Sequence, residues 1–177
     1  MTVIALRGHR PEVLGDLLER YGREIQGLAY LILRDRDAAE DVLTDTLLAA
    51  LEHGHTLRDE GALRPWLLRI AVNRALAVRR TNARIVTLAV IPDVADQGDD
   101  VDERLTLLAA VERLAPRTRA AVVLRYYVDL SLRDVAVALG TSENTVKTQL
   151  REALGQMRKT LRVAPADDPR TSEVLHG

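Results

Sequence analysis

Several residue types are missing from this sequence of 177 residues, which has no cysteine, no phenylalanine and only 3% aromatic residues. Without cysteine the chain cannot form disulfides, use a thiolate nucleophile or hold a Cys-ligated zinc or iron–sulfur site, which fits a reducing cytoplasm. No apolar run approaches the roughly 18 residues of a membrane span. Residues 1–10 hold too short an apolar stretch for a secretion signal. We therefore expect a cytoplasmic protein with no membrane insertion.

The charge of the chain is nearly balanced in total, at −1, but very uneven along its length. Residues 61–92 carry six arginines and no acidic residue, whereas residues 93–103 carry six acidic residues and no basic one. Residues 144–162 carry five basic residues against one acidic residue. Two basic segments joined by an acidic one suit binding to a single extended polyanion. Each arginine taken alone has an equally ordinary interpretation, as a solvated residue on a helix face.

Apolar residues recur at steps of three and four along most of the chain, which is the period of amphipathic helices. The second predicted helix begins at Asp37 as its cap, with Glu40 completing a capping box. Thr141 or Ser142 caps the last helix. The predicted helices cover residues 11–32, 37–53, 63–80, 105–114, 117–127, 132–139 and 143–162. Only residues 84–90 show a strand-like alternation, which is short and isolated, so the pattern predicts an all-α fold.

The distribution of these helices predicts two small helical domains joined by a flexible linker. The first domain covers residues 1–84 and the second covers residues 104–163. Residues 85–103 lack a helical period and form the acidic interdomain linker. The tail, residues 164–177, contains two prolines, and we expect it to be disordered.

The segment from Ser131 to Leu150 contains the parts of a helix-turn-helix. Ala136 is small enough for a close helix crossing, Gly140 suits a turn with positive φ, and Val146 and Leu150 face inward. The polar positions of the second helix then point toward the major groove of DNA. These positions are Glu143, Asn144, Lys147, Thr148 and Arg151. The alternative is a helical hairpin with no role in DNA binding.

No pattern in the sequence indicates catalysis. His53 and His55 are two residues apart, which is the wrong spacing for one helical face, and no Glu-x-x-His partner accompanies them. A phosphate-cradling glycine loop and a Gly-x-Ser-x-Gly elbow are both absent. We therefore expect no enzyme activity, no cofactor and no metal site.

Three stretches in order along the chain resemble the extracytoplasmic-function sigma factors, the minimal two-domain class of the bacterial sigma-70 family. Residues 34–43 resemble the core-binding motif of the family's region 2, and residues 63–75 resemble its promoter-reading helix. Residues 114–150 resemble region 4 with its helix-turn-helix. The resemblance implies a region 2 helical bundle, a region 4 domain, and transcription initiation at specific promoters.

The resemblance also implies partners. Core RNA polymerase would be bound through the clamp helices of its β′ chain and the flap of its β chain, and an anti-sigma factor would regulate the protein. The polymerase-binding positions that match the family are Glu40, Asp41, Thr44, Asp45 and Leu48. Acidic residues beside an exposed leucine suit a mixed electrostatic and apolar docking surface, although acids near a helix start also favour the helix dipole.

Promoter DNA is the third implied partner. In the family, the loop between the last two helices of region 2, here residues 53–61, captures a base of the minus-ten element. The implied minus-ten residues are His55, Arg58, Arg69, Asn73, Arg74, Arg79 and Arg80. At the minus-thirty-five element, Lys147, Thr148 and Arg151 would enter the major groove. Arg117, Arg119 and Arg158 would contact phosphates, which position the protein without reading sequence.

The sequence departs from the family pattern where Thr44 and Asp45 replace the common Gln-Glu pair and Leu47 replaces a common Phe. We expect Trp66 in the core, so strand opening would use a base pocket and not a wall of aromatic wedges. A stand-alone helix-turn-helix regulator that binds duplex DNA as a dimer is the alternative function. It would bind duplex DNA tightly without polymerase, whereas a sigma factor would need core polymerase.

Overall fold

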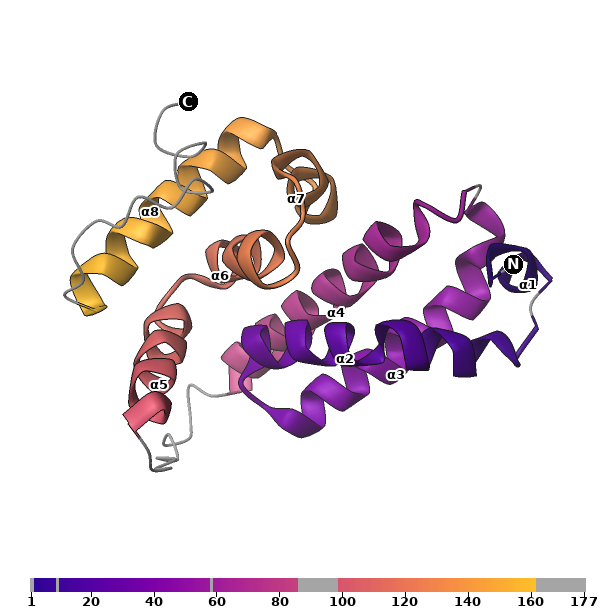
Figure 1. Cartoon of the computed structure of the whole chain (residues 1–177), viewed down its shortest axis with the longest axis horizontal. Coiled ribbons are helices and arrows are strands. Elements are labelled where there is room, and N and C mark those ends of the chain that lie inside the picture. Colours follow the sequence, from indigo (N-terminus) through magenta and orange to yellow (C-terminus); the bar gives the residue numbers. More distant parts are fainter. Residues whose placement is uncertain (1, 9, 58, 86–98, 162–177) are drawn as a thin grey trace.

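The computed structural model describes residues 2–8, 10–57, 59–85 and 99–161, and every regular element in these ranges is helical. The prediction of an all-α protein with two helical domains is confirmed. The first domain contains α1 (Thr2–Arg7), α2 (Val13–Leu33), α3 (Arg36–His53), the 3₁₀ turn η1 (Gly54–Thr56) and α4 (Leu63–Ile85). The second contains α5 (Asp99–Glu112), α6 (Pro116–Val122), the π-helical turn η3 (Val123–Tyr127), α7 (Leu132–Leu139) and α8 (Glu143–Leu161) (Figure 1).

The structure corrects several predicted boundaries. Helix α3 is capped by Asp35 and not by Asp37, since the Asp35 side chain accepts a hydrogen bond from the backbone N–H of Ala38 at 3.0 Å. Helix α4 continues to Ile85, five residues past its predicted end at Arg80. Helix α5 begins at Asp99, inside the predicted linker. The rest of the linker, residues 86–98, and the predicted tail, residues 164–177, lie outside the described residues.

Helices α2, α3 and α4 form a bundle, with α1 and η1 packed at the end of it that lies away from α5 and α8 (Figure 1). Leu17, Ile25, Leu28 and Ile32 of α2 are fully buried, which is the stripe that the three- and four-residue steps predict. In the second domain, α6, α7 and α8 pack around Leu124, Val135, Val146 and Leu150.

The two domains pack against each other, a contact that the sequence does not indicate. Helix α7 lies on α4, and α2 contacts α5, α6 and η3. Arg64 of α4 donates to the Glu24 carboxylate of α2 at 3.0 Å and to the carbonyl of Val128, after η3, at 2.7 Å. The hydrogen bond with Glu24 raises the pKa of Arg64. At the far end of α2, Arg34 lies 3.7 Å from the Glu112 carboxylate of α5.

The side chain of Arg119, on α6, is fully buried at this junction. Its guanidinium donates to the carbonyls of Ile32, at the end of α2, at 2.9 Å and of Val111, at the end of α5, at 3.2 Å. Burial, and then the nearby charge of Arg79, lower the pKa of Arg119 to about 10. The group therefore keeps its charge at neutral pH, and carbonyls from two helix C-termini compensate it.

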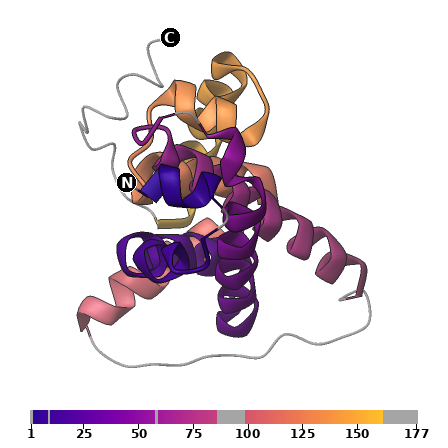
Figure 2. The ribbon, with the colours of Figure 1, turned by 90° about the vertical axis from the view of Figure 1, so that its right-hand side faces the viewer.

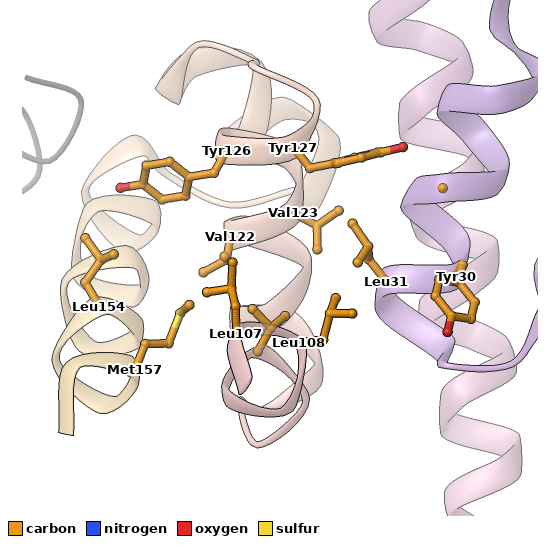
Figure 3. A pocket seen from close by; sticks show the side chains of 12 residues that line it. Tyr30, Leu31, Leu107, Leu108, Val122, Val123, Tyr126, Tyr127, Leu154 and Met157 are labelled. Carbon is orange, nitrogen blue, oxygen red and sulfur yellow. The ribbon is translucent and has the colours of Figure 1, made fainter. Parts of the chain in front are cut away.

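Tyr127 makes the closest approach of η3 to α2. Its hydroxyl lies against Gly27, where an added Cβ atom would collide with it. Figure 3 shows the Tyr127 ring reaching from the second domain toward α2. This contact requires a residue without a side chain at position 27, because any Cβ would occupy the position of the hydroxyl.

We expect the substitution Gly27→Leu to force the domains apart, because the new side chain displaces Tyr127. The helix itself should be retained, since leucine favours a helix by about 1 kcal/mol over glycine. The radius of gyration in small-angle X-ray scattering should rise above that of the wild type, for which a compact chain of this length has roughly 16 Å. Gly15→Leu is the matched control, since Gly15 is an exposed glycine of the same helix with no atom within 4 Å of an added Cβ. Equal scattering from both variants would contradict the prediction.

Candidate DNA-binding and polymerase-binding surfaces

The positions implied in polymerase binding form one exposed face of α3. Their spacing of one, four, five and eight residues from Glu40 places them on the same side of a helix. All five side chains, those of Glu40, Asp41, Thr44, Asp45 and Leu48, are exposed, and Leu48 is 48% exposed. The opposite face carries the buried Val42, Thr46 and Ala50, so the core orients this surface. We call these five residues the α3 surface.

A groove of about 430 Å³ runs between α3 and α4, beside the α3 surface. Arg69, Asn73 and Arg74 of α4 line it together with His53 and Trp66. Three of the implied minus-ten residues are thus brought together on one wall. Trp66 is half-buried: it packs against the core, as predicted, and the part of its side chain that stays exposed also lines this groove. We call this groove the α3–α4 groove.

An ion pair joins the α3 surface to the α3–α4 groove. Arg74 Nη1 lies 2.7 Å from Asp45 Oδ2. More than a third of each side chain is exposed, so the pair adds at most about 1 kcal/mol to stability. Its main consequence is geometric, because Asp45 of the α3 surface fixes the orientation of the Arg74 side chain in the groove.

The remaining implied minus-ten residues are more scattered. His55 is exposed on η1, with Nδ1 3.1 Å from the carbonyl of Glu52, and Arg80 is exposed on α4. Arg79 instead donates to the carbonyl of Ile32 at 3.1 Å, on the α2 side of α4. In this arrangement Arg79 is therefore held away from the α3–α4 groove. Arg58 lies outside the described residues.

The predicted helix-turn-helix is present in α7 and α8. Gly140 has φ +62° and ends α7, as the turn requires. Ser142 caps α8 by accepting a hydrogen bond from the N–H of Thr145 at 3.1 Å, and Ser131 caps α7 in the same way through the N–H of Asp134. Val146 and Leu150 are fully buried, so the polar positions of α8 face outward.

Four of the five major-groove candidates on α8 are exposed, and Lys147 is partly exposed. The exposed four are Glu143, Asn144, Thr148 and Arg151. Among the three implied phosphate-contacting arginines, Arg117 is exposed and donates to the carbonyl of Leu139 at 2.5 Å, and Arg158 is partly buried. Arg119 differs, because its buried guanidinium cannot reach a phosphate in this arrangement. No local signal in the sequence distinguishes Arg119 from Arg117.

An apolar cavity of about 610 Å³ lies between the domains. Tyr30 and Leu31 of α2, Leu107 of α5, Tyr127 of η3 and Met157 of α8 are among the residues that line it (Figure 3). Leu107 is 45% exposed and Tyr127 is 51% exposed, so the cavity opens to solvent through apolar side chains. We call it the interdomain cavity.

No group of three or more His, Cys, Asp or Glu residues in the described ranges is placed to hold a metal ion. Among the helices of those ranges, none is long and apolar enough to cross a membrane.

Known proteins match this chain in both domains. The family descriptions "Sigma-70 region 2" and "Sigma-70, region 4" match residues 17–85 and 104–157. The ECF RNA polymerase sigma factor SigM of Mycobacterium tuberculosis is 33% identical over 148 residues, covering 82% of this chain and 76% of SigM. The RNA polymerase sigma-E factor of Streptomyces coelicolor is 30% identical, covering 84% of this chain and 89% of that protein. The chain belongs to the extracytoplasmic-function (ECF) sigma factors.

Solved sigma factor structures share this fold. Sigma factor RpoE, crystallised with the anti-sigma factor NepR from Bartonella quintana, superposes with a TM-score of 0.69 at 22% identity, covering 85% of this chain and 98% of RpoE. CnrH, solved with the cytosolic domain of CnrY, superposes with a TM-score of 0.68 at 20% identity, covering 91% of this chain and 95% of CnrH. The first domain is thus the sigma region 2 domain and the second is the region 4 domain.

Membership of this family decides the function in outline. An ECF sigma factor binds core RNA polymerase and directs initiation at specific promoters, so the alternative of a stand-alone dimeric regulator is not favoured. The match to Sigma-70 region 2 begins at residue 17 and leaves out α1, a helix that the sequence pattern does not predict. Six residues give too short an apolar pattern for a helix to be predicted.

We expect the substitution Arg151→Ala in this sigma factor to weaken binding only at its preferred minus-thirty-five sequences, by about 1–3 kcal/mol, because a base-contacting arginine discriminates between bases. Arg158→Ala should lower binding to all sequences alike and make the salt dependence shallower, because a phosphate contact carries no sequence information. Promoter-competition assays with the holoenzyme measure both effects. Equal losses on every sequence for Arg151→Ala would contradict its role in reading bases.

Proposed function

We propose that the α3–α4 groove binds the non-template strand of the minus-ten element. One observation carries this proposal, which is that Trp66, Arg69, Asn73 and Arg74 line a single groove next to the α3 surface. Single-stranded DNA is bound by cations that follow the backbone and by aromatic rings on which bases stack. The half-exposed Trp66 supplies one such ring in a chain that has few aromatic residues. Together with a base held by residues 53–61, this supports strand opening by capture of single bases.

The exposed end of α8 supports recognition of the minus-thirty-five element in the major groove. Asn144, Thr148 and Arg151 are exposed at the positions where a recognition helix contacts base edges. Arg117 is on α6, and its guanidinium donates to the carbonyl of Leu139 at the end of α7. This position suits a phosphate contact that fixes the register of α8 on the duplex.

The α3 surface is the proposed docking site for the clamp helices of the β′ chain, and the region 4 domain is the proposed partner of the β flap. Three acidic residues precede the exposed Leu48 on this face, which suits a mixed electrostatic and apolar contact. Since core polymerase is a cytoplasmic enzyme, the cytoplasm is the proposed location of the protein.

Promoter binding requires the two domains to separate. Minus-ten and minus-thirty-five elements lie about 25 base pairs apart, which is about 85 Å along B-form DNA at 3.4 Å per pair. The packing of α7 on α4, and of α2 on α5, α6 and η3, instead holds the two domains in direct contact. The packed arrangement is therefore the proposed resting form, which core polymerase opens.

A pull-down with core RNA polymerase followed by run-off transcription tests this function. We expect Leu48→Ser to lower the affinity for core polymerase about tenfold or more, because a central apolar contact of an interface is lost. Leu18→Ser is the matched control, because Leu18 is 50% exposed on α2 and lies outside the α3 surface. Tight sequence-specific binding to duplex DNA without polymerase, and no retention of polymerase, would instead favour the dimeric regulator.

The interdomain cavity is the proposed docking site of an anti-sigma factor. The structurally similar RpoE was solved with the anti-sigma factor NepR, and CnrH was solved with the cytosolic domain of CnrY. The exposed Leu107 and Tyr127 at the cavity suit the apolar face of an amphipathic helix, which would join the domains in their packed arrangement.

We expect Leu107→Lys to free the sigma factor from an anti-sigma protein that co-purifies with it, because a charge at the cavity opposes an apolar helix. Run-off transcription by the variant holoenzyme should resist concentrations of that protein that inhibit the wild type. Val137→Lys is the control, since Val137 is 57% exposed on α7 and does not line the cavity. Equal inhibition of Leu107→Lys and wild type would exclude the cavity as the docking site.

A further inference from the structure

Helix α1 is closely packed although the match to Sigma-70 region 2 begins only at residue 17. Figure 2 views the molecule from the end where α1 lies. Leu6 is fully buried and Val3 is 5% exposed. Leu6 packs directly on η1, where a Cβ atom added to Gly54 would lie 2.7 Å from the Leu6 Cβ. The helix and the turn can therefore approach this closely only because position 54 has no side chain.

Polar contacts tie both ends of α1 to the same connection between α3 and α4. At its start, the Glu60 carboxylate accepts hydrogen bonds from the N–H groups of Thr2 at 2.9 Å and Val3 at 3.3 Å. At its end, Arg7 Nε donates to the carbonyl of Leu57 at 2.9 Å. Glu60 thus takes the part of a capping residue for two of the N–H groups that a helix start leaves unbonded.

These contacts fix the connection between α3 and α4 as well as α1. A helix of six residues is marginal without tertiary support, and η1 is a single 3₁₀ turn. Arg20 of α2 also donates to the Thr2 hydroxyl at 3.1 Å, which links α1 to the central bundle. Helix α1 therefore links the connection between α3 and α4 to helix α2. None of the other hydrogen bonds described above joins that connection to α2.

We propose that α1 positions residues 53–61 and thereby sets the base preference at the minus-ten element, with Arg7 and Glu60 as the positioning residues. This inference rests on the proposed function of residues 53–61. His55 is exposed on η1, between the two points at Leu57 and Gly54 where α1 holds the turn. Discrimination between bases requires a pocket of fixed shape, because a mobile pocket accommodates several bases with similar free energy.

Transcription of a template library, randomised at both promoter elements, by the reconstituted holoenzyme tests this inference. In Glu60→Gln the new amide NH₂ group faces a backbone N–H, and in Arg7→Met the donor to Leu57 is lost. Each variant should lower the preference for the best minus-ten base by about 3- to 10-fold, the effect of one hydrogen bond. Preferences at the minus-thirty-five element and affinity for core polymerase should equal those of the wild type. Arg7→Lys, which keeps a donor, should restore much of the preference.

Arg10→Met and Glu12→Gln are the matched controls, because they make the same changes of charge as Arg7→Met and Glu60→Gln. Arg10 and Glu12 are exposed and form an ion pair with each other just after α1. Both should keep the wild-type base preferences, and thermal unfolding verifies that all variants are folded. Wild-type minus-ten preferences in Glu60→Gln and Arg7→Met would overturn the positioning role of α1. If His55→Ala also leaves those preferences unchanged, the proposed role of residues 53–61 fails as well, whereas a changed preference in His55→Ala alone confines the failure to α1.

Discussion

The arrangement of the two domains depends on the burial of one cation, the guanidinium of Arg119. Removing a charge from water costs several kcal/mol unless hydrogen bonds and opposite charge compensate it. Here the compensation comes from the C-terminal ends of α2 and α5, whose free carbonyls carry partial negative charge. The α2 end belongs to the region 2 domain and the α5 end to the region 4 domain. The same interaction therefore satisfies Arg119 and sets how the domains pack.

The two proposed DNA-binding surfaces are formed independently of the junction between the domains. The α3–α4 groove and the exposed end of α8 each depend on the core of their own domain. The junction between domains uses other residues, including Arg64, Tyr127 and Arg119. Separation of the domains would therefore leave both surfaces intact, and it would expose Arg119 and the apolar interdomain cavity.

Within region 2, two binding surfaces share adjacent helices. The α3 surface and the α3–α4 groove meet at the ion pair of Asp45 and Arg74. A polymerase contact at Asp45 would weaken the ion pair of Asp45 with Arg74. Polymerase binding could thereby change the orientation of Arg74 in the groove. The chain has few aromatic residues, so the proposed stacking role falls to Trp66, which packs against the core and also lines the groove.

Local spacing in the sequence was enough to determine the longer helices apart from some of their ends, the helix-turn-helix with Gly140 at its turn, and the common exposed face of Glu40, Asp41, Thr44, Asp45 and Leu48. Each of these depends on residues within a few positions of one another, where helical periodicity and backbone preference act. Only the tertiary structure decided the burial of Arg119, the position of Trp66 between the core and the α3–α4 groove, and the place of α1. Arg119 is held by Ile32, 87 residues away, and α1 by Glu60, 58 residues from Thr2. Such contacts arise from how packed helices meet, and no local pattern encodes them.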